Sequence, residues 1–146
     1  MADNVALQHK HLVAQCQTFA SATTGAGVTI DARGYTMATF FVGLGTTVGA
    51  DMTVDVKTQS DADSGMGSPT DITNGALSQI TSGGAADNTL RVLVIDLTRV
   101  SERYIRSFVT TANTVTSCPI YIHCVLSNGP IQTLKADYAD YDANFS

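Results

Sequence analysis

The amino-acid sequence predicts an all-β protein that folds as a single-domain sandwich or jelly-roll-like structure. Apolar and polar residues alternate over residues 52–60, which is the pattern of a strand with one buried face. The run 103–111 has large side chains on both faces and no helical period. Turn-forming residues separate such runs at fairly regular intervals, as expected for sheets folded back on one another.

The first predicted strands lie before residue 60. Residues 28–31 form a short strand, and the Arg33-Gly34 pair then turns the chain. The next strand, 36–44, carries apolar side chains on both faces, so we expect it to be central in its sheet. The alternating strand 52–60 follows.

The remaining strands are predicted after residue 70. Residues 77–81 are compatible with a short strand or with a helical turn. Residues 91–97 form a nearly continuous apolar run, and we expect this strand to be buried on both sides. The run 100–111 and the alternating run 120–127 complete a set of seven or eight strands.

The two ends of the chain differ from this middle region. We expect an N-terminal arm over 1–24, a β-sandwich domain over 25–134 and a mobile C-terminal tail over 135–146. The apolar spacing in the arm also allows a short helix, and a tail that is merely solvated is an equally open alternative. Apolar and aromatic side chains on these ends are the candidate partner contacts: Leu7, Leu12, Phe19, Tyr138, Tyr141 and Phe145.

Composition narrows the possible partners. Charged residues make up 14% of the 146 residues, against roughly 25% in ordinary soluble domains. So little surface charge predicts that part of the exterior is buried against copies of the chain or another protein. The net charge is −5 and the basic residues form no long run, so nucleic acid is not an expected partner. The sequence shows no secretory signal and no apolar run that would span a membrane.

Cysteines and histidines do not form a recognisable metal motif. The three cysteines, Cys16, Cys118 and Cys124, have no usual zinc spacing, and we expect free, largely buried thiols. His9 and His11 could both reach one metal ion from an extended segment. Because no further ligands lie near them in the sequence, we favour a solvated arm.

An acidic segment resembles the start of a calcium-binding loop. Asp61 and Asp63 are spaced so that both carboxylates could point at one cation. The sixth position of such a loop would be Met66 rather than glycine, and the twelfth would be Ile72 rather than glutamate. We therefore expect a turn, with no metal bound.

Catalytic and cofactor motifs are equally weak. His123 and Cys124 are adjacent on a predicted strand, so their side chains point to opposite faces and cannot form a nucleophile–base pair. Residues 101–103 lack a partner group for acid–base chemistry. The glycines between 43 and 49 are followed by β-type residues, and no helix opens there to bind a phosphate. We expect neither enzymatic activity nor a cofactor.

The order of short segments along the chain is more informative than any single motif. These segments are 54–63, 71–73 with 75–76, 93–97, 102–106, and 120–126 with 128–130. Over about residues 36–130, this order resembles the head decoration, or cement, proteins of tailed bacteriophages and related small virion structural proteins. It is a pattern of strands and turns and contains no diagnostic motif.

This resemblance implies a jelly-roll-like subunit without catalytic residues or cofactor. Such a subunit docks on the exterior of an assembled capsid, often as a homotrimer, and bridges neighbouring copies of the major capsid protein. Its location would be the capsid exterior of the virion, after assembly in the host cytoplasm. Because the two ends fall outside the matching region, their docking role is our own expectation: removing 1–20 or 135–146 should weaken association and leave the domain folded.

Two alternatives come from other functional classes. A carbohydrate-binding or host-adhesion module of the virion would show exposed aromatic side chains around a shallow groove, and the absence of tryptophan disfavours it. A hydrolase would need a carboxylate pair or a Ser-His-Asp set that only folding could assemble.

Overall fold

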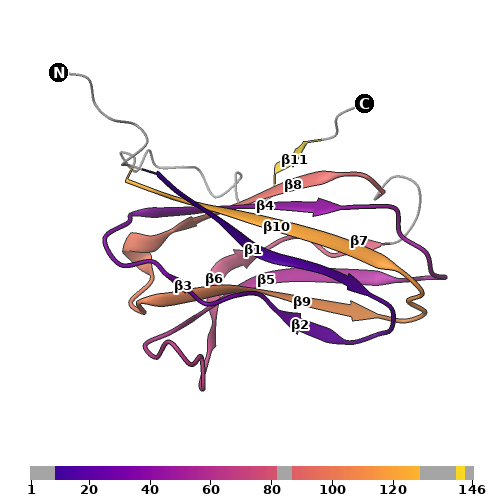
Figure 1. Cartoon of the computed structure of the whole chain (residues 1–146), viewed down its shortest axis with the longest axis horizontal. Coiled ribbons are helices and arrows are strands. Elements are labelled where there is room, and N and C mark those ends of the chain that lie inside the picture. The colour runs from indigo at the N-terminus through magenta and orange to yellow at the C-terminus, as the bar shows by residue number, and fades with distance from the viewer. Residues whose placement is uncertain (1–8, 82–86, 129–140, 144–146) are drawn as a thin grey trace.

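The computed structural model describes residues 9–81, 87–128 and 141–143. Its elements are β1 (His9–Phe19), β2 (Thr24–Ala26), β3 (Ile30–Asp31), β4 (Met37–Leu44), β5 (Thr53–Asp61), β6 (Thr70–Ala76), β7 (Ile80–Thr81), β8 (Leu90–Asp96), the 3₁₀ turn η1 (Leu97–Arg99), β9 (Tyr104–Ala112), β10 (Cys118–Ser127) and β11 (Tyr141–Ala143). Figure 1 shows the strands in two layers. Sheet A has the order β1-β10-β4-β8-β11, and sheet B has the order β2-β9-β5-β6, with β3 beside β9 and β7 beside β5.

The strands are nested in antiparallel pairs from the ends of the chain inward. β1 pairs with β10, β2 with β9, β4 with β8, and β5 with β6. If β2 with β3 and β6 with β7 are each taken as one interrupted strand, this is the eight-strand order of a jelly roll, in which one long ribbon of paired strands folds over into two sheets. The predicted fold class, an all-β sandwich, is confirmed.

The core lies between the two sheets. In β4 the inward residues Ala38, Phe40, Val42 and Leu44 are buried and alternate with half-buried outward ones, and the strand is central in sheet A as predicted. Burying each large apolar side chain contributes about 1.5–3 kcal/mol. The largest fully buried side chains are Phe19, Phe40, Ile30, Met52, Ile80, Leu93, Ile105, Ile122, Leu126, Val42, Val54 and Val56.

The expected N-terminal arm is wrong for the residues that the structure describes. Residues 9–19 form β1, an edge strand of sheet A, and β2 begins at Thr24. A β-bulge between Val13 and Gln15 breaks the alternation, so that Ala14 and Gln15 are both buried. This irregular spacing is why the sequence lacked a clear strand pattern here. The sandwich therefore includes β1, and residues 1–8 lie outside the described residues.

The expected mobile tail also needs correction in part. Tyr141–Ala143 form β11, which pairs with β8 so that Tyr141 lies opposite Val92. The edge of β8 offers unpaired backbone N–H and C=O groups, and a short strand satisfies them. The rest of the segment 135–146 lies outside the described residues.

Several smaller expectations can be compared with the structure. Residues 77–81 contain the short strand β7, paired with β5. The strand β8 is buried on its inner side, but Val92 and Val94 on its outer side are half-buried. The expectation that both sides are buried is therefore wrong for the outer side. The strand β6 was not predicted. None of the helical segments in the described ranges has the length and apolar character needed to cross a bilayer.

Candidate functional site

The two outward faces of the sandwich differ in chemistry, and the face of sheet B carries the charges. Lys57 Nζ lies 2.7 Å from Asp71 Oδ2, and Gln59 donates to the other oxygen of that carboxylate at 3.0 Å. Arg106 donates to Gln59 Oε1 through Nε at 3.0 Å and Nη2 at 2.9 Å. Hydrogen bonds from Lys57 and then Gln59 lower the pKa of Asp71. This face therefore satisfies its polar groups internally.

A second ionic contact joins β3 to Arg103, the residue before β9, at the edge of sheet B. Arg103 donates to both carboxylate oxygens of Asp31, at 3.0 Å from Nε and 2.6 Å from Nη2. This contact, helped by the backbone N–H of Arg33, lowers the pKa of Asp31 to about 2. The Arg103 guanidinium also lies 5.0 Å from the centroid of the Tyr104 ring. Arg103 is thus engaged within the subunit.

The outer face of sheet A has the opposite character. It consists of the outward residues of four strands: His9, His11, Val13, Cys16 and Thr18 from β1; Pro119, Tyr121, His123 and Val125 from β10; Met37, Thr39, Phe41 and Gly43 from β4; and Leu90, Val92, Val94 and Asp96 from β8. This set contains no lysine or arginine, and Asp96 is its one carboxylate. A sheet face of this composition has few groups that favour contact with water.

The strand register aligns these side chains in rows across sheet A. One row runs from Val13 through His123 and Phe41 to Val92. Val13 on the edge strand is 51% exposed, although it is apolar. Phe41 and Val92 in the same row are half-buried, so apolar surface on this face stays partly open to solvent. Apolar surface that gathers in one patch marks interaction sites in soluble proteins. The outer face of sheet A is therefore the candidate docking surface.

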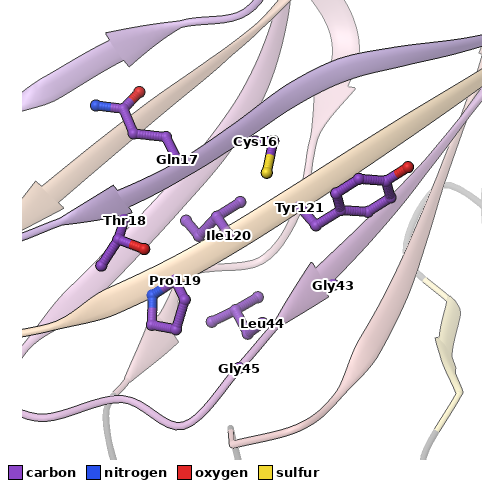
Figure 2. A pocket seen from close by; sticks show the side chains of 9 residues that line it. All are labelled: Cys16, Gln17, Thr18, Gly43, Leu44, Gly45, Pro119, Ile120 and Tyr121. Atoms are coloured by element: carbon purple, nitrogen blue, oxygen red, sulfur yellow. The ribbon is translucent and has the colours of Figure 1, made fainter.

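A hollow of about 480 Å³ lies at one end of this surface, between β1, β10 and β4. Tyr121 is 46% exposed and lies opposite Gly43 in the strand register. Because glycine has no side chain, the surface is recessed beside the tyrosine ring. Figure 2 shows the ring of Tyr121 on β10, with Cys16 on the neighbouring β1. Thr18 and Pro119 also line the hollow, which is open to solvent.

Two histidines meet on the same surface. His11 Nδ1 and His123 Nε2 are 3.1 Å apart, and the ring centroids are 5.4 Å apart with the rings tilted by 39°. Their strands are adjacent, with His11 opposite Val125 and Val13 opposite His123, so the two imidazoles are diagonal neighbours. The sequence predicted His11 on a solvated arm. The contact depends on the register between β1 and β10, which the sequence does not reveal.

Of the predicted partner contacts, the structure describes the side chains of Leu12 and Phe19. Phe19 is 1% exposed and belongs to the core, so the expectation that it contacts a partner is wrong. Leu12 is half-buried and packs against the same core, and the backbone of Tyr141 is part of β11. Leu7, Tyr138 and Phe145 lie outside the described residues. The sequence does carry one signal for this surface: strands 36–44 and 91–97 have a second apolar face, which lies on the outer side of sheet A.

The thiols divide into two kinds. Cys118 and Cys124 are buried, as expected, and burial raises the pKa of both, that of Cys124 to about 12. Cys16 is exposed, so the expectation of burial is wrong for it. The bulge before Gln15 shifts the alternation of β1 and turns Cys16 outward. Cys124 and His123 lie on opposite faces of β10, as predicted.

The acidic segment forms a turn, as predicted. Asp61 accepts hydrogen bonds from the backbone N–H groups of Asp63 at 3.0 Å and Ser68 at 2.9 Å, which lower its pKa. Asp63 accepts from the N–H of Gly65 at 3.0 Å. These carboxylates cap the backbone of their own loop. Within the described ranges, no group of three or more His, Cys, Asp or Glu side chains is placed to hold a metal ion.

Comparison with known proteins defines the fold class. No family model matches the chain, and no curated protein matches it. The fold is similar to that of a chain in the structure of infectious bursal disease virus Gx strain, with a TM-score of 0.51 and 10% identity over 91% of this chain and 34% of that chain. A chain from the Gt strain gives 0.50 and 11% over 91% and 35%. This chain thus spans about a third of either viral chain, and what they share is the fold.

Proposed function

We propose that this chain is a structural component of a virus particle that acts by contact rather than by catalysis. In this proposal it binds the exterior of an assembled tailed-bacteriophage capsid as a homotrimer and bridges neighbouring subunits of the major capsid protein. The fold-level likeness to chains of a virus structure and the resemblance of segments 54–130 to decoration proteins both support it.

One observation carries the proposal: the outer face of sheet A is largely apolar and has no lysine or arginine, whereas the charged and polar side chains of sheet B bond to one another. Removing apolar surface from water contributes about 25 cal/mol per Å². A face rich in valine and aromatic side chains, without lysine or arginine, is therefore suited to lie against another protein. A trimer would present three such faces to the capsid at once, and the combined binding can exceed single-site affinity by about 100-fold.

The proposal can be tested with charged substitutions at exposed apolar and aromatic residues, with Val13 and Val28 as a matched pair. Val13→Asp and Tyr121→Asp place a carboxylate on the docking surface, whereas Val28→Asp, at a valine that is 54% exposed, does so in the segment between β2 and β3. Binding to emptied capsids of the virus that encodes the chain is measured by co-sedimentation, and subunit number by light scattering. Loss of a buried anchor costs about 2 kcal/mol or more. Capsid binding should therefore fall for the first two variants and persist for the third.

Two outcomes would contradict the proposal. If the wild-type chain ignores emptied capsids, the decoration role fails. If Val13→Asp and Tyr121→Asp bind as tightly as Val28→Asp, the outer face of sheet A is not the contact, even when the protein does bind capsids.

A second candidate function is carbohydrate binding, which the hollow beside Tyr121 favours. An exposed aromatic ring at the rim of a shallow hollow can stack against a sugar, and Gln17 and Thr18 at that rim offer polar groups. A glycan array would reveal binding that is lost in Tyr121→Ala and kept in Val13→Asp. Capsid binding should be weakened by Val13→Asp, so this variant separates the two functions.

A further inference from the structure

We infer that His11 and His123 form a two-imidazole site for a divalent transition metal ion such as Zn²⁺, Ni²⁺ or Cu²⁺. The site lies on the outer face of sheet A, and it joins the edge strand β1 to β10. The inference rests on the geometry of the two rings and does not depend on the proposed virion role.

The separation of the two nitrogens carries the inference. Imidazole nitrogens bind such metals at about 2.0–2.1 Å, so two of them on one ion lie about 2.9 Å apart at a right angle and about 3.3 Å apart at a tetrahedral angle. His11 Nδ1 and His123 Nε2 are 3.1 Å apart, between these two values. The rings are tilted by 39° rather than stacked face to face, and each presents a ring nitrogen to the other.

The strands hold this geometry with little freedom. β1 and β10 are paired along most of their length, so the Cα positions of both histidines are fixed by backbone hydrogen bonds. The ring of Phe41 lies beside that of His123, with the two centroids 6.5 Å apart and the rings tilted by 44°. The contact is exposed, so that water can complete the coordination of the ion.

The chemistry of the donors selects the class of metal. Neutral imidazole suits zinc, copper and nickel, whereas magnesium and calcium require oxygen ligands. In the metal-free pair one ring donates its N–H to the other, because two imidazole lone pairs do not attract. When the ion binds, that proton moves to the other nitrogen of the same ring, so each ring offers one lone pair and no net proton is released from the neutral pair.

Metal binding should be measured on untagged full-length protein in a Cys16→Ser background, because the exposed thiol of Cys16 is a competing ligand on the same strand. Titration calorimetry with Zn²⁺ and Ni²⁺ gives the affinity, and electron paramagnetic resonance with Cu²⁺ reports the number of bound nitrogens. His11→Ala and His123→Ala should each weaken binding by on the order of 100-fold, because the second imidazole otherwise binds intramolecularly. His9→Ala, on the same strand, should bind as the parent does.

Thermal unfolding supplies a second measurement that does not require tight binding. An ion that binds only the folded chain raises its Tm. Zn²⁺ should therefore raise the Tm of the parent and of His9→Ala, and chelation should reverse the rise. Zn²⁺ should not raise the Tm of His11→Ala or His123→Ala. Circular dichroism spectra of these two variants show whether they fold.

The inference is overturned if the parent binds none of these ions at millimolar concentration. It is also overturned if either His11→Ala or His123→Ala keeps the parent affinity, or if His9→Ala loses as much as they do. A Cu²⁺ spectrum with a single bound nitrogen would exclude the two-imidazole site.

Discussion

At the scale of single residues, Gln15 is the clearest polar link between the two sheets. Its side chain is buried, its Oε1 accepts a hydrogen bond from Ser107 Oγ at 3.0 Å, and its Nε2 donates to the carbonyl of Gly25 at 3.3 Å. A buried amide is tolerated in a core only when such bonds satisfy it. The bulge in β1 turns Gln15 inward, and the hydroxyl and carbonyl in sheet B satisfy it there.

Replacing this amide should destabilise the fold. Gln15→Leu leaves the Ser107 hydroxyl and the Gly25 carbonyl without their partner, which costs about 1–3 kcal/mol. Gln17→Leu, at an exposed position two residues later, should change the stability by less than about 0.5 kcal/mol. Urea unfolding of both variants compares the two positions. Equal stabilities would show that the buried amide contributes nothing.

The three thiols should react at very different rates. Cys16 is exposed, whereas burial raises the pKa of Cys118 and Cys124 and hides both from solvent. A thiol reagent at pH 8 should therefore modify one cysteine of the native protein and all three after denaturation. Cys16→Ser should abolish the native reaction. Modification of two or three thiols in the folded protein would contradict the assigned orientation of β1.

The ion pair between Asp31 and Arg103 predicts a specific response to acid. The pKa of Asp31 is lowered from 3.8 to about 2, chiefly by its hydrogen bond with Arg103. A lowered carboxyl pKa stabilises the fold above the unfolded value, and this contribution disappears as the pH falls from 3.8 towards 2. The midpoint of urea unfolding should fall more steeply over this range in wild type than in Asp31→Asn. If the urea-unfolding midpoint falls with pH equally in both proteins, the ion pair of Asp31 does not make this contribution to stability.

The alternation of side chains allowed many residues to be placed from the sequence. In β4 and β10, Phe40 and Ile122 face the core as the period of two predicts, and His123 lies outward. Gln15 and Phe19 could not be placed, because one bulge residue reverses every side chain beyond it. The pairing of His11 with His123 could not be predicted either, since their 112-residue separation gives no information about register.

At the scale of elements, β1 changes what a truncation should do. The sequence predicted that removing 1–20 would leave the domain folded, but this deletion takes away β1 and the buried ring of Phe19. Losing a buried phenylalanine alone costs about 3–5 kcal/mol. The 1–20 deletion should therefore be largely unfolded by circular dichroism. A folded 1–20 deletion would show that β1 is dispensable.

Strands with a regular alternation or a long apolar run were predictable, and short or irregular ones were not. The runs 36–44, 52–60 and 120–127 correspond closely to β4, β5 and β10. The short strand β2 carries little side-chain pattern, and β6 has mostly exposed residues around a single buried glycine, Gly75. Such strands are held by the backbone of their neighbours rather than by their own apolar faces.

At the scale of the whole molecule, the sequence predicted the fold class, which is confirmed, and a contact role, which stays a prediction. We expected Leu7, Phe19 and Tyr141 at the ends of the chain to meet the partner. The candidate docking surface combines Val13 with Tyr121, and the pairing of β1 with β10 brings these side chains together. A surface made from both ends of a chain depends on topology, and topology does not follow from local patterns.

The nested order of the strands has a consequence for biosynthesis. Among the residues that the structure describes, β10 is the last long strand to leave the ribosome, yet it lies between β1 and β4, so β1 has no neighbouring strand in sheet A until β10 has been made. Pairings this distant in sequence form slowly, because a long loop must close first. A nascent chain arrested at residue 117 should remain sensitive to protease, and the exposed strands of such intermediates are the stage at which chaperones would be needed.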